Sequence, residues 1–489
     1  MQLSLYSKHT KIVATIGPAS CEPGVLRAMI RAGMNVARIN FSHGDHQTHG
    51  RTIDHIRRIA AEEGAVVAVL CDIQGPKIRI GALQEEPLML ENSDRITLTV
   101  DDCIGAQGLI SLPHPEFVRD ITAGTTLLLD DGNLQFLVTE TDGKNLRCEV
   151  VVGGALKSRK GVSAPNARLT LSAITKKDRA DIKFALSKDC DYIAMSFVRS
   201  AKDIHELKDL MQEAGAQVSV IAKIEMGEAL ENIEAIIAVC DGIMVARGDL
   251  GIETPAEEVP FHQKRIIKLC NDAAKPVITA TQMLESMTEN PRPTRAEASD
   301  VYNAILDGTD AIMLSAESAS GKYPVRAVEV MSEIASIAEK NLPYQGDGLQ
   351  PAPVRRQPSG EPREEMSDAI SKATSDISEV IKPKAIVTTT MSGYTTRRVA
   401  KERPRTPILC MTPSATTQRR MALVWGVTAL QIPEFTTIDE MIRNIIRAAH
   451  GKGLVVEGDR LVIIAGVPFG VDGQTNLIKI HIVGEAGEI

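Results

Sequence analysis

Apolar runs of strand length alternate with segments of helical periodicity along most of the chain. Apolar strands separated by helices are typical of parallel β/α units, in which both faces of each strand are buried. Eight runs in this rhythm are the number that closes a (β/α)8 TIM barrel, so this α/β fold is predicted. The eight runs are 11–17, 35–41, 66–73, 190–197, 219–225, 242–248, 276–282 and 310–317.

The rhythm is interrupted from Gly75-Pro76 to about residue 171. The interruption contains short runs in which apolar and polar residues alternate. Turn signals such as Asp131-Gly132 and Asp142-Gly143 separate these runs. The pattern predicts a small antiparallel β module, which we expect to form a small β-barrel lid inserted into the larger barrel.

A stretch rich in proline, glycine and charge predicts a linker at 345–365, and a second α/β pattern follows it. The apolar runs of that pattern are 385–390, 407–412, 429–432 and 460–466. We therefore expect a barrel formed by 1–74 and 172–344, a lid at 75–171, the linker, and a C-terminal α/β regulatory domain at 366–489.

Composition excludes several classes of function. The 489 residues are enough for roughly two to four domains, and 43% of them are hydrophobic, as in ordinary globular proteins. A net charge of −8 and an aromatic content of 3% disfavour nucleic-acid binding. The eight cysteines are scattered without a C-x-x-C pair, which indicates a reducing compartment. With no apolar leader and no run of about 20 apolar residues, we expect a cytoplasmic protein that binds neither nucleic acid nor a membrane.

Polar side chains stand at the carboxyl ends of nearly all the predicted barrel strands. These ends build the active site of a TIM barrel, and so many polar residues from separate strands predict a catalytic mouth. A structural role stays open for Thr281 as a β-branched strand residue, and for Ser315 and Glu317 as helix-cap or core residues. The set is Arg38, Asn40, Asp72, Ser196, Lys223, Glu225, Arg247, Asp249, Thr281, Gln282, Ser315 and Glu317.

Lys223, Glu225 and Asp249 indicate the chemistry. Lys223 and Glu225 share one face of a strand, and taken alone the three residues fit a buried ion pair as well as a cation site. Carboxylates without a neighbouring histidine or cysteine favour Mg²⁺ or Mn²⁺ over zinc. Arg38 and Arg79 add the positive charge that phosphoryl transfer requires beside a metal, although there is no P-loop and no G-x-G-x-x-G.

Nine ordered segments carry a resemblance that covers nearly the whole chain. With them the chain resembles the pyruvate kinases of the bacterial type. The segments are K-I-V-A-T-I-G-P-A-S (11–20), M-N-V-A-R-I-N-F-S-H-G (34–44), D-I-Q-G-P-K-I-R (72–79), K-G-V-S-A-P-N (160–166), A-K-I-E (222–225), M-V-A-R-G-D-L-G (244–251), A-T-Q-M-L-E-S-M (280–287), N-P-R-P-T-R-A-E (290–297) and M-L-S-A-E-S-A-S-G-K-Y-P (313–324).

The resemblance implies a glycolytic transfer of the phosphoryl group of phosphoenolpyruvate to ADP, giving pyruvate and ATP. It implies that Glu225 and Asp249 bind Mg²⁺ or Mn²⁺. Lys223 would neutralise the phosphoryl group in flight and the developing enolate, and Arg38 would hold the phosphate. Thr281 would lie on the face where the enolate is protonated.

The resemblance also assigns supporting roles. Gly248 would bind the substrate carboxylate through backbone N–H groups, and Ser315 is a further candidate for substrate binding. Arg79 and Lys160 would contact the nucleotide phosphates, although Arg79 fits a surface ion pair as well. The lid would close to exclude water, and the family implies a homotetramer.

One departure from the family pattern concerns K⁺. Many members bind it with residues that match Asn40, Ser42, Asp72 and the carbonyl of Ile73, and they place a glutamate where this chain has Lys77. An ammonium is one compact positive charge, so we expect Lys77 to replace K⁺ and the enzyme to be independent of it. The alternative is that Lys77 points into solvent.

The C-terminal domain resembles the allosteric domain of the family. Hydroxyls and backbone N–H groups in 388–396 suit a phosphate, although an ordinary Ser/Thr helix cap is the alternative. Relatives activated by fructose bisphosphate often carry basic residues here and in the loop at 467–476, where this chain has Met391, Tyr394 and Asp472. We therefore expect an effector with a single phosphate, AMP or a sugar monophosphate. The candidate contacts are Thr390, Ser392, Gly393, Tyr394 and Thr395.

Two other classes of function stay open on the residues alone. A metal-dependent barrel lyase or aldolase that works through a pyruvate enolate would share Lys223, Glu225 and Asp249, but it would need neither the lid nor Lys160. A catalytically inactive sensor with the same fold would not need to retain these three residues.

Overall fold

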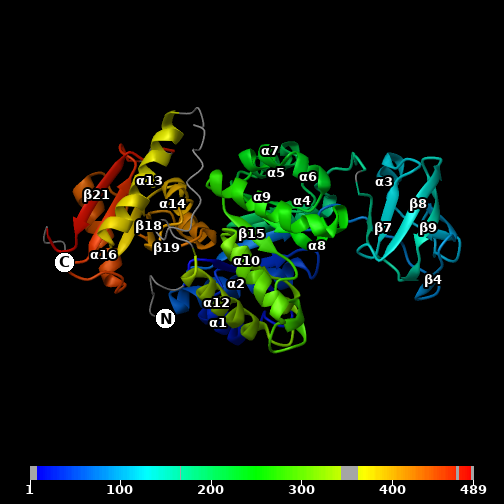
Figure 1. Ribbon diagram of the computed structural model, residues 1–489, viewed down its shortest axis with the longest axis horizontal. Helices are drawn as coiled ribbons and strands as arrows, with labels where there is room; N and C mark the ends of the chain where they lie inside the picture. The colour runs from blue at the N-terminus through cyan, green and yellow to red at the C-terminus, as the bar shows by residue number, and fades with distance from the viewer. Residues whose placement is uncertain (1–7, 166, 343–361, 470–472, 486–489) are drawn as a thin grey trace.

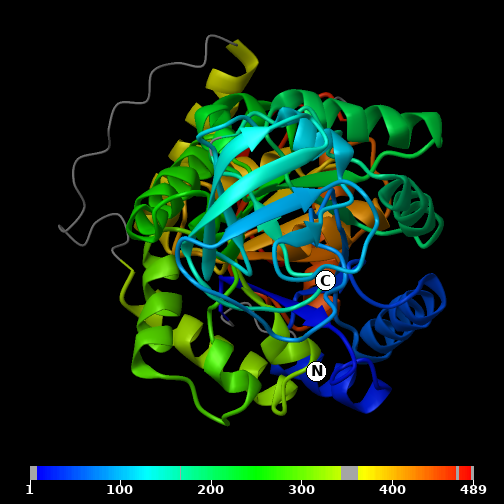
Figure 2. The same ribbon diagram turned by 90° about the vertical axis from the view of Figure 1, so that its right-hand side faces the viewer.

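The structure is a computed structural model that describes residues 8–165, 167–342, 362–469 and 473–485. Figure 1 shows three bodies along its longest axis: a central body of strands ringed by helices, a β-rich body on one side and an α/β body on the other. In the turned view of Figure 2 the β-rich body lies in front of the central body. The chain therefore has a linear arrangement of three folding units.

The central body is a closed barrel of eight strands in the order β1-β16-β15-β14-β13-β12-β3-β2, and all neighbours are parallel. This confirms the predicted TIM barrel. The strands are β1 (Lys11–Ile16), β2 (Val36–Asn40), β3 (Ala68–Ile73), β12 (Tyr192–Met195), β13 (Ser219–Ile224), β14 (Gly242–Ala246), β15 (Val277–Ala280) and β16 (Ala311–Leu314).

Helices connect these strands and surround the barrel, and several begin at side-chain caps read directly from the sequence. Asp45 accepts the backbone N–H of Thr48, and Thr175 forms a capping box with Asp178. None of the helices in the described residues is long and apolar enough to cross a membrane. The elements are α1 (Pro23–Ala32), α2 (His46–Glu63), α4 (Lys176–Ser187), α5 (Ala201–Glu213), α6 (Gly227–Glu231), α7 (Ile233–Val239), α8 (Arg247–Glu253), η1 (Ala256–Glu258), α9 (Val259–Asp272), η2 (Glu285–Thr288), α10 (Arg295–Leu306), α11 (Ala316–Ala319) and α12 (Pro324–Lys340).

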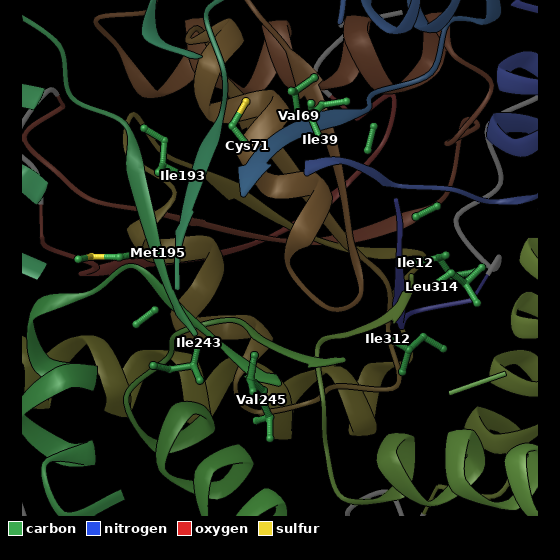
Figure 3. Close-up of a cluster of buried hydrophobic side chains, with 14 of the residues drawn as sticks. Ile12, Ile39, Val69, Cys71, Ile193, Met195, Ile243, Val245, Ile312 and Leu314 are labelled. Atoms are coloured by element: carbon green, nitrogen blue, oxygen red, sulfur yellow. The ribbon is translucent and has the colours of Figure 1, made fainter. Parts of the chain in front are cut away.

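The barrel strands sort their side chains by alternation. Val13 belongs to the cluster inside the barrel, whereas its neighbours Ile12 and Ala14 belong to the larger cluster between strands and helices. Figure 3 shows members of this outer layer, including Ile193 and Leu314. Because both layers are apolar, charged side chains on the interior face are expected only where that core ends.

The inserted body leaves the barrel after β3 and has a core of its own. Its main sheet has the order β11-β7-β8-β9-β5-β6, with a separate pair β10-β4. The prediction of an antiparallel module holds except for β5 and β6, which are parallel. The elements are β4 (Leu88–Leu90), β5 (Arg95–Thr99), β6 (Leu109–Ser111), α3 (Pro115–Asp120), β7 (Thr126–Leu129), β8 (Leu134–Thr141), β9 (Asn145–Val152), β10 (Gly154–Leu156) and β11 (Val162–Ser163).

The C-terminal body is a five-stranded sheet in the order β19-β18-β17-β20-β21. The edge strand β21 is antiparallel to β20 and was not among the predicted strands. The predicted linker lies outside the described residues as far as 361, and its last four positions, 362–365, are the first turn of α13. The elements are α13 (Pro362–Ile381), β17 (Ala385–Thr389), α14 (Tyr394–Ala400), β18 (Ile408–Thr412), α15 (Ala415–Arg420), η3 (Met421–Leu423), β19 (Val427–Gln431), α16 (Ile438–Gly451), β20 (Arg460–Ala465) and β21 (Leu477–Ile482).

The C-terminal body closes the amino-terminal end of the barrel. Leu423 belongs to the same buried cluster as the side chains inside the barrel. Trp425 is buried beside it, with the ring of His9 at 4.5 Å in an edge-on contact and the guanidinium of Arg403 at 4.9 Å. This apolar plug separates the barrel floor from solvent, so the opposite end is the open mouth.

Candidate active site

The polar residues of the barrel mouth continue the interior face of the strands. Five of them lie two residues beyond a member of the interior cluster, so alternation directs their side chains inward where the apolar core ends. Arg38 and Asp72 are well buried, at 9% and 1% exposed, and so is Glu225, which lies two residues beyond Lys223 and is 2% exposed. The pairs are Val13 and Thr15, Val36 and Arg38, Leu70 and Asp72, Ala194 and Ser196, and Ile221 and Lys223.

Lys223 is the centre of a buried network. Its ammonium lies 2.8 Å from Glu225 Oε1 and 3.3 Å from Asp72 Oδ1, and it donates to Ser196 Oγ at 2.7 Å. Arg38 Nε donates to the other oxygen of Asp72 at 2.7 Å. On the sequence alone, a buried ion pair and a catalytic centre were alternatives. The structure has the buried ion pair, and it lies at the barrel mouth.

The charged groups of this network shift one another's pKa values. Burial opposes the charge on Lys223, but Asp72 and Glu225 outweigh it and raise the pKa of Lys223 to about 12. Burial also opposes ionisation of Asp72, yet Lys223 and Arg38 lower its pKa. Burial and the charge of Asp249 raise the pKa of Glu225 despite Lys223. Lys223 therefore stays a cation at neutral pH, and two carboxylates compete for one positive charge.

Glu225 and Asp249 fit a divalent cation. Glu225 Oε2 accepts the backbone N–H of Phe197 at 2.8 Å, and Asp249 lies in the first turn of α8. The negative charge of Asp249 acts on Glu225, which is the repulsion that a bound cation would relieve. In the part of the chain that the structure describes, no three histidine, cysteine or acidic side chains gather around one metal position. The two carboxylates would therefore leave further positions to substrate oxygens and water, as Mg²⁺ prefers.

Thr281 and Gly248 are brought together beside this pair. The N–H of Gly248 donates to Thr281 Oγ1 at 2.8 Å, and the Thr281 hydroxyl donates to the carbonyl of Ala280 at 2.6 Å. Ser315 precedes α11 and is half-buried, while Glu317 is buried and accepts the N–H groups of Ser315 and Leu284. Glu317 is thus a core polar residue that fixes two loops, one of the alternatives left open by the sequence.

Arg79 and Lys160 lie together where the lid joins the barrel. Arg79 pairs with Gly161 in an isolated bridge and donates to the carbonyl of Arg159 at 2.8 Å. The Lys160 ammonium lies 2.5 Å from Asp130. A cleft of about 990 Å³ separates the lid from α8, with Thr126 on one wall and Thr254 on the other. The lid thus stands apart from the barrel and carries two cations at its base, Arg79, which is exposed, and Lys160, which is half-buried.

The residues expected to bind K⁺ lie on neighbouring strands. Asn40 faces Asp72 in the register of β2 and β3, and its side-chain oxygen accepts the N–H of Ser42 at 3.1 Å. The carbonyl of Ile73 accepts the hydroxyl of Ser196 at 2.8 Å. Lys77 is exposed, and within the described residues nothing pairs with its ammonium.

The predicted effector segment lines a pocket of about 460 Å³ in the C-terminal body. No lysine or arginine is among the described residues that line it, and Asp472 lies outside the described residues. Phe435 and Phe469 form one wall, with ring centroids 4.8 Å apart. The lining includes four of the five predicted contacts, Thr390, Ser392, Tyr394 and Thr395, and Gly393 adjoins it.

Comparison with known proteins identifies the relatives of this architecture. A family model described as the pyruvate kinase barrel domain matches residues 7–328, and a second, the pyruvate kinase alpha/beta domain, matches residues 368–481. The chain belongs to the pyruvate kinase family. It is a phosphotransferase of the bacterial pyruvate kinase type.

Pyruvate kinase relatives match along nearly the whole chain. The pyruvate kinase of Geobacillus stearothermophilus is 46% identical over 98% of this chain and 81% of its own length. That of Clostridium perfringens is 44% identical over 97% of this chain and 99% of its own length. A crystal structure of a Cryptosporidium parvum pyruvate kinase superimposes with a TM-score of 0.88 at 35% identity, covering 98% and 97% of the two chains.

The candidate pyruvate kinase site contains one residue that the sequence analysis missed. Thr15 accepts Arg38 Nη1 at 2.9 Å and donates to the carbonyl of Leu314 at 2.8 Å, so it orients the arginine. Its signal was present, because Thr15 follows the interior residue Val13 by two positions.

Proposed function

We propose that phosphoryl transfer from phosphoenolpyruvate to ADP takes place around Lys223, Glu225 and Asp249. The observation that supports this most directly is the buried Lys223 ammonium, 2.8 Å from Glu225 at the barrel mouth. The test is a coupled assay for ATP and pyruvate formed from phosphoenolpyruvate and ADP. A lyase or aldolase would form no ATP, and an inactive sensor would turn over nothing.

The residues divide the charge of the reaction between them. Glu225 and Asp249 would hold Mg²⁺, which would supply Lewis-acid stabilisation of the enolate. Lys223, whose pKa of about 12 keeps it charged, neutralises the phosphoryl group and the enolate oxygen. Arg38, already fixed by Asp72, holds the phosphate. These fixed cations need no rearrangement when negative charge moves from the substrate to ADP.

The lid completes the site when it closes over the cleft beside α8. Arg79 and Lys160 bind the nucleotide phosphates, for which Lys160 exchanges its partner Asp130. Closure excludes water, which protects the phosphoryl group from hydrolysis. Gly248 binds the substrate carboxylate, with Ser315 beside the substrate and Thr281 facing the carbon that is protonated.

We expect K⁺ independence because the Lys77 ammonium, which has no partner among the described residues, supplies the charge that K⁺ would bring. Replacing K⁺ by a bulky organic cation should change kcat by no more than about twofold, and Lys77→Glu should create a K⁺ requirement of about tenfold or more. Steady-state rates at constant ionic strength measure both. A large loss of kcat in the unmodified protein would contradict this role.

The pocket in the C-terminal body is proposed to bind an effector with one phosphate, either AMP or a sugar monophosphate. Its lining of hydroxyls and aromatic rings, with no cation among the described residues, suits one phosphate better than two. Monophosphates should lower the KM for phosphoenolpyruvate, and Ser392→Asp should abolish this response by repulsion. Activation by micromolar fructose 1,6-bisphosphate alone would contradict the proposal.

The homotetramer is a prediction from the family, and the cytoplasmic location is a prediction from the composition. Size-exclusion chromatography with light scattering tests the first, because four copies of the 52.8 kDa chain differ clearly in mass from one or two.

A further inference from the structure

The turn that follows β15 has an unfavourable backbone conformation. Thr281 has φ 68° and Gln282 has φ 53°, so two consecutive residues other than glycine are left-handed. A residue other than glycine rarely adopts this conformation, least of all a β-branched one, because it is strained. The turn therefore persists only because its surroundings hold it.

Arg247 provides that hold on the main chain. Its Nη2 donates to the carbonyls of Thr281 at 2.6 Å and Gln282 at 3.3 Å, and its Nε donates to the carbonyl of Ala280 at 3.3 Å. One guanidinium thus binds three successive carbonyls of the turn. The side chain is only 11% exposed, so these bonds form largely away from water.

The opposite edge of the guanidinium is anchored on the helices outside the turn. Nη1 lies 2.8 Å and 2.7 Å from the two oxygens of Asp300 on α10, and 3.4 Å from Gln263 Oε1 on α9. A planar fork that donates on both edges has one orientation, which a lysine ammonium does not reproduce. Arg247 therefore connects the turn to α9 and α10 through hydrogen bonds on both edges of its guanidinium.

The next two residues connect this clamp to the reacting groups. Gly248 donates its N–H to the Thr281 hydroxyl at 2.8 Å, and Asp249 is the candidate metal ligand. We propose that Arg247 is a positioning residue, which holds Thr281 in its left-handed conformation and so presents the Thr281 hydroxyl to the enolate carbon. This inference rests on the proposed function and assigns the residue that fixes its protonation step.

The proton step can be observed separately from phosphoryl transfer. In the reverse direction a C–H bond of the pyruvate methyl group breaks, its electron pair forms the enolate, and the proton leaves to solvent. In D₂O a deuteron then returns to the same carbon, which NMR detects. Loss of the clamp displaces Thr281 from this carbon, and a displacement of about 1 Å costs about 10²-fold in rate.

The experiment compares Arg247→Met, Arg247→Lys and Asp300→Asn with the control Arg265→Met. Arg265 lies on α9 and makes a long contact of 3.5 Å to the carbonyl of Leu230. We expect both Arg247 variants to lower kcat and methyl exchange by about 10²-fold, with the affinity for Mn²⁺ and the KM for phosphoenolpyruvate nearly unchanged. Asp300→Asn should lower both rates less, and the control should not lower them. In a third variant of this residue, Arg247→Ala, added methylguanidinium should partly restore kcat and methyl exchange.

Three results would overturn the inference. If methyl exchange were unchanged in Arg247→Met, Arg247 would not position Thr281 for the proton step. A parallel loss of Mn²⁺ binding would place the effect on Asp249 instead, and full activity in Arg247→Lys would exclude the fork geometry. Absence of ATP formation by the unmodified protein would instead contradict the proposed function, so the two failures are distinguishable.

Discussion

Replacing Lys223 by methionine is expected to lower kcat by at least about 10³-fold, which is about 4 kcal/mol of transition-state stabilisation. The ammonium lies 2.8 Å from Glu225 and 3.3 Å from Asp72, and methionine keeps most of the length of the side chain while removing that charge. Affinity for Mn²⁺ should be retained or increased, because Glu225 no longer shares its charge with a lysine. Steady-state rates and calorimetric titration of Mn²⁺ measure the two effects.

The matched control is Lys264→Met, which removes an exposed lysine that pairs with Asp307 on the outside of the barrel. It should leave kcat nearly unchanged, because Lys264 lies on α9 on the outside of the barrel and not among the groups of the mouth. If Lys223→Met kept a substantial rate, the role assigned to the ammonium would be wrong. If it lost Mn²⁺ binding as well, the variant would have disrupted the whole site.

Replacing Glu225 by glutamine is expected to weaken Mn²⁺ binding by at least about 10²-fold and to abolish its pH dependence. Because the pKa of Glu225 is raised, protons compete with the cation at a higher pH than for an ordinary carboxyl group. In the unmodified protein the Mn²⁺ affinity should be greatest above this pKa. Below it, the affinity should fall by about tenfold per pH unit. Titrations across mildly acidic to neutral pH measure both effects.

Two further variants test whether the pH dependence of Mn²⁺ binding belongs to Glu225. Asp249→Asn removes the charge that helps raise the pKa of Glu225, so its weaker Mn²⁺ binding should persist to lower pH. Glu234→Gln changes an exposed carboxylate on the neighbouring α7 and should alter neither the affinity nor its pH dependence. A pH dependence that survives in Glu225→Gln would assign the proton to another group.

Much of the fold and the charged centre could be predicted because they depend on local periodicity. The barrel strands are nearly continuous apolar runs, and the mouth residues extend the interior alternation by one step, as Asp72 extends Leu70 and Lys223 extends Ile221. Thr15 follows Val13 by the same step, so the same rule would have predicted it as a residue of the site.

Other features depend on contacts between distant segments, which periodicity does not contain. The 276–282 run was expected to be a strand to its end, but β15 stops at Ala280, because Arg247 from another β/α unit holds the left-handed turn beyond it. The parallel pairing of β5 with β6 likewise depends on a connection that returns the chain to the end of the sheet at which β5 begins. β21 alternates only weakly and lies at an edge, so its assignment required its partner β20.

The apolar plug under the barrel contains the only tryptophan of the chain, Trp425. Its indole is 2% exposed between His9 of the barrel and Arg403 of the C-terminal body, so its surroundings come from both units. Indole emission shifts to longer wavelength when water reaches the ring. Intrinsic fluorescence of the unlabelled protein is therefore an optical reporter of one event, the separation of the C-terminal body from the barrel floor.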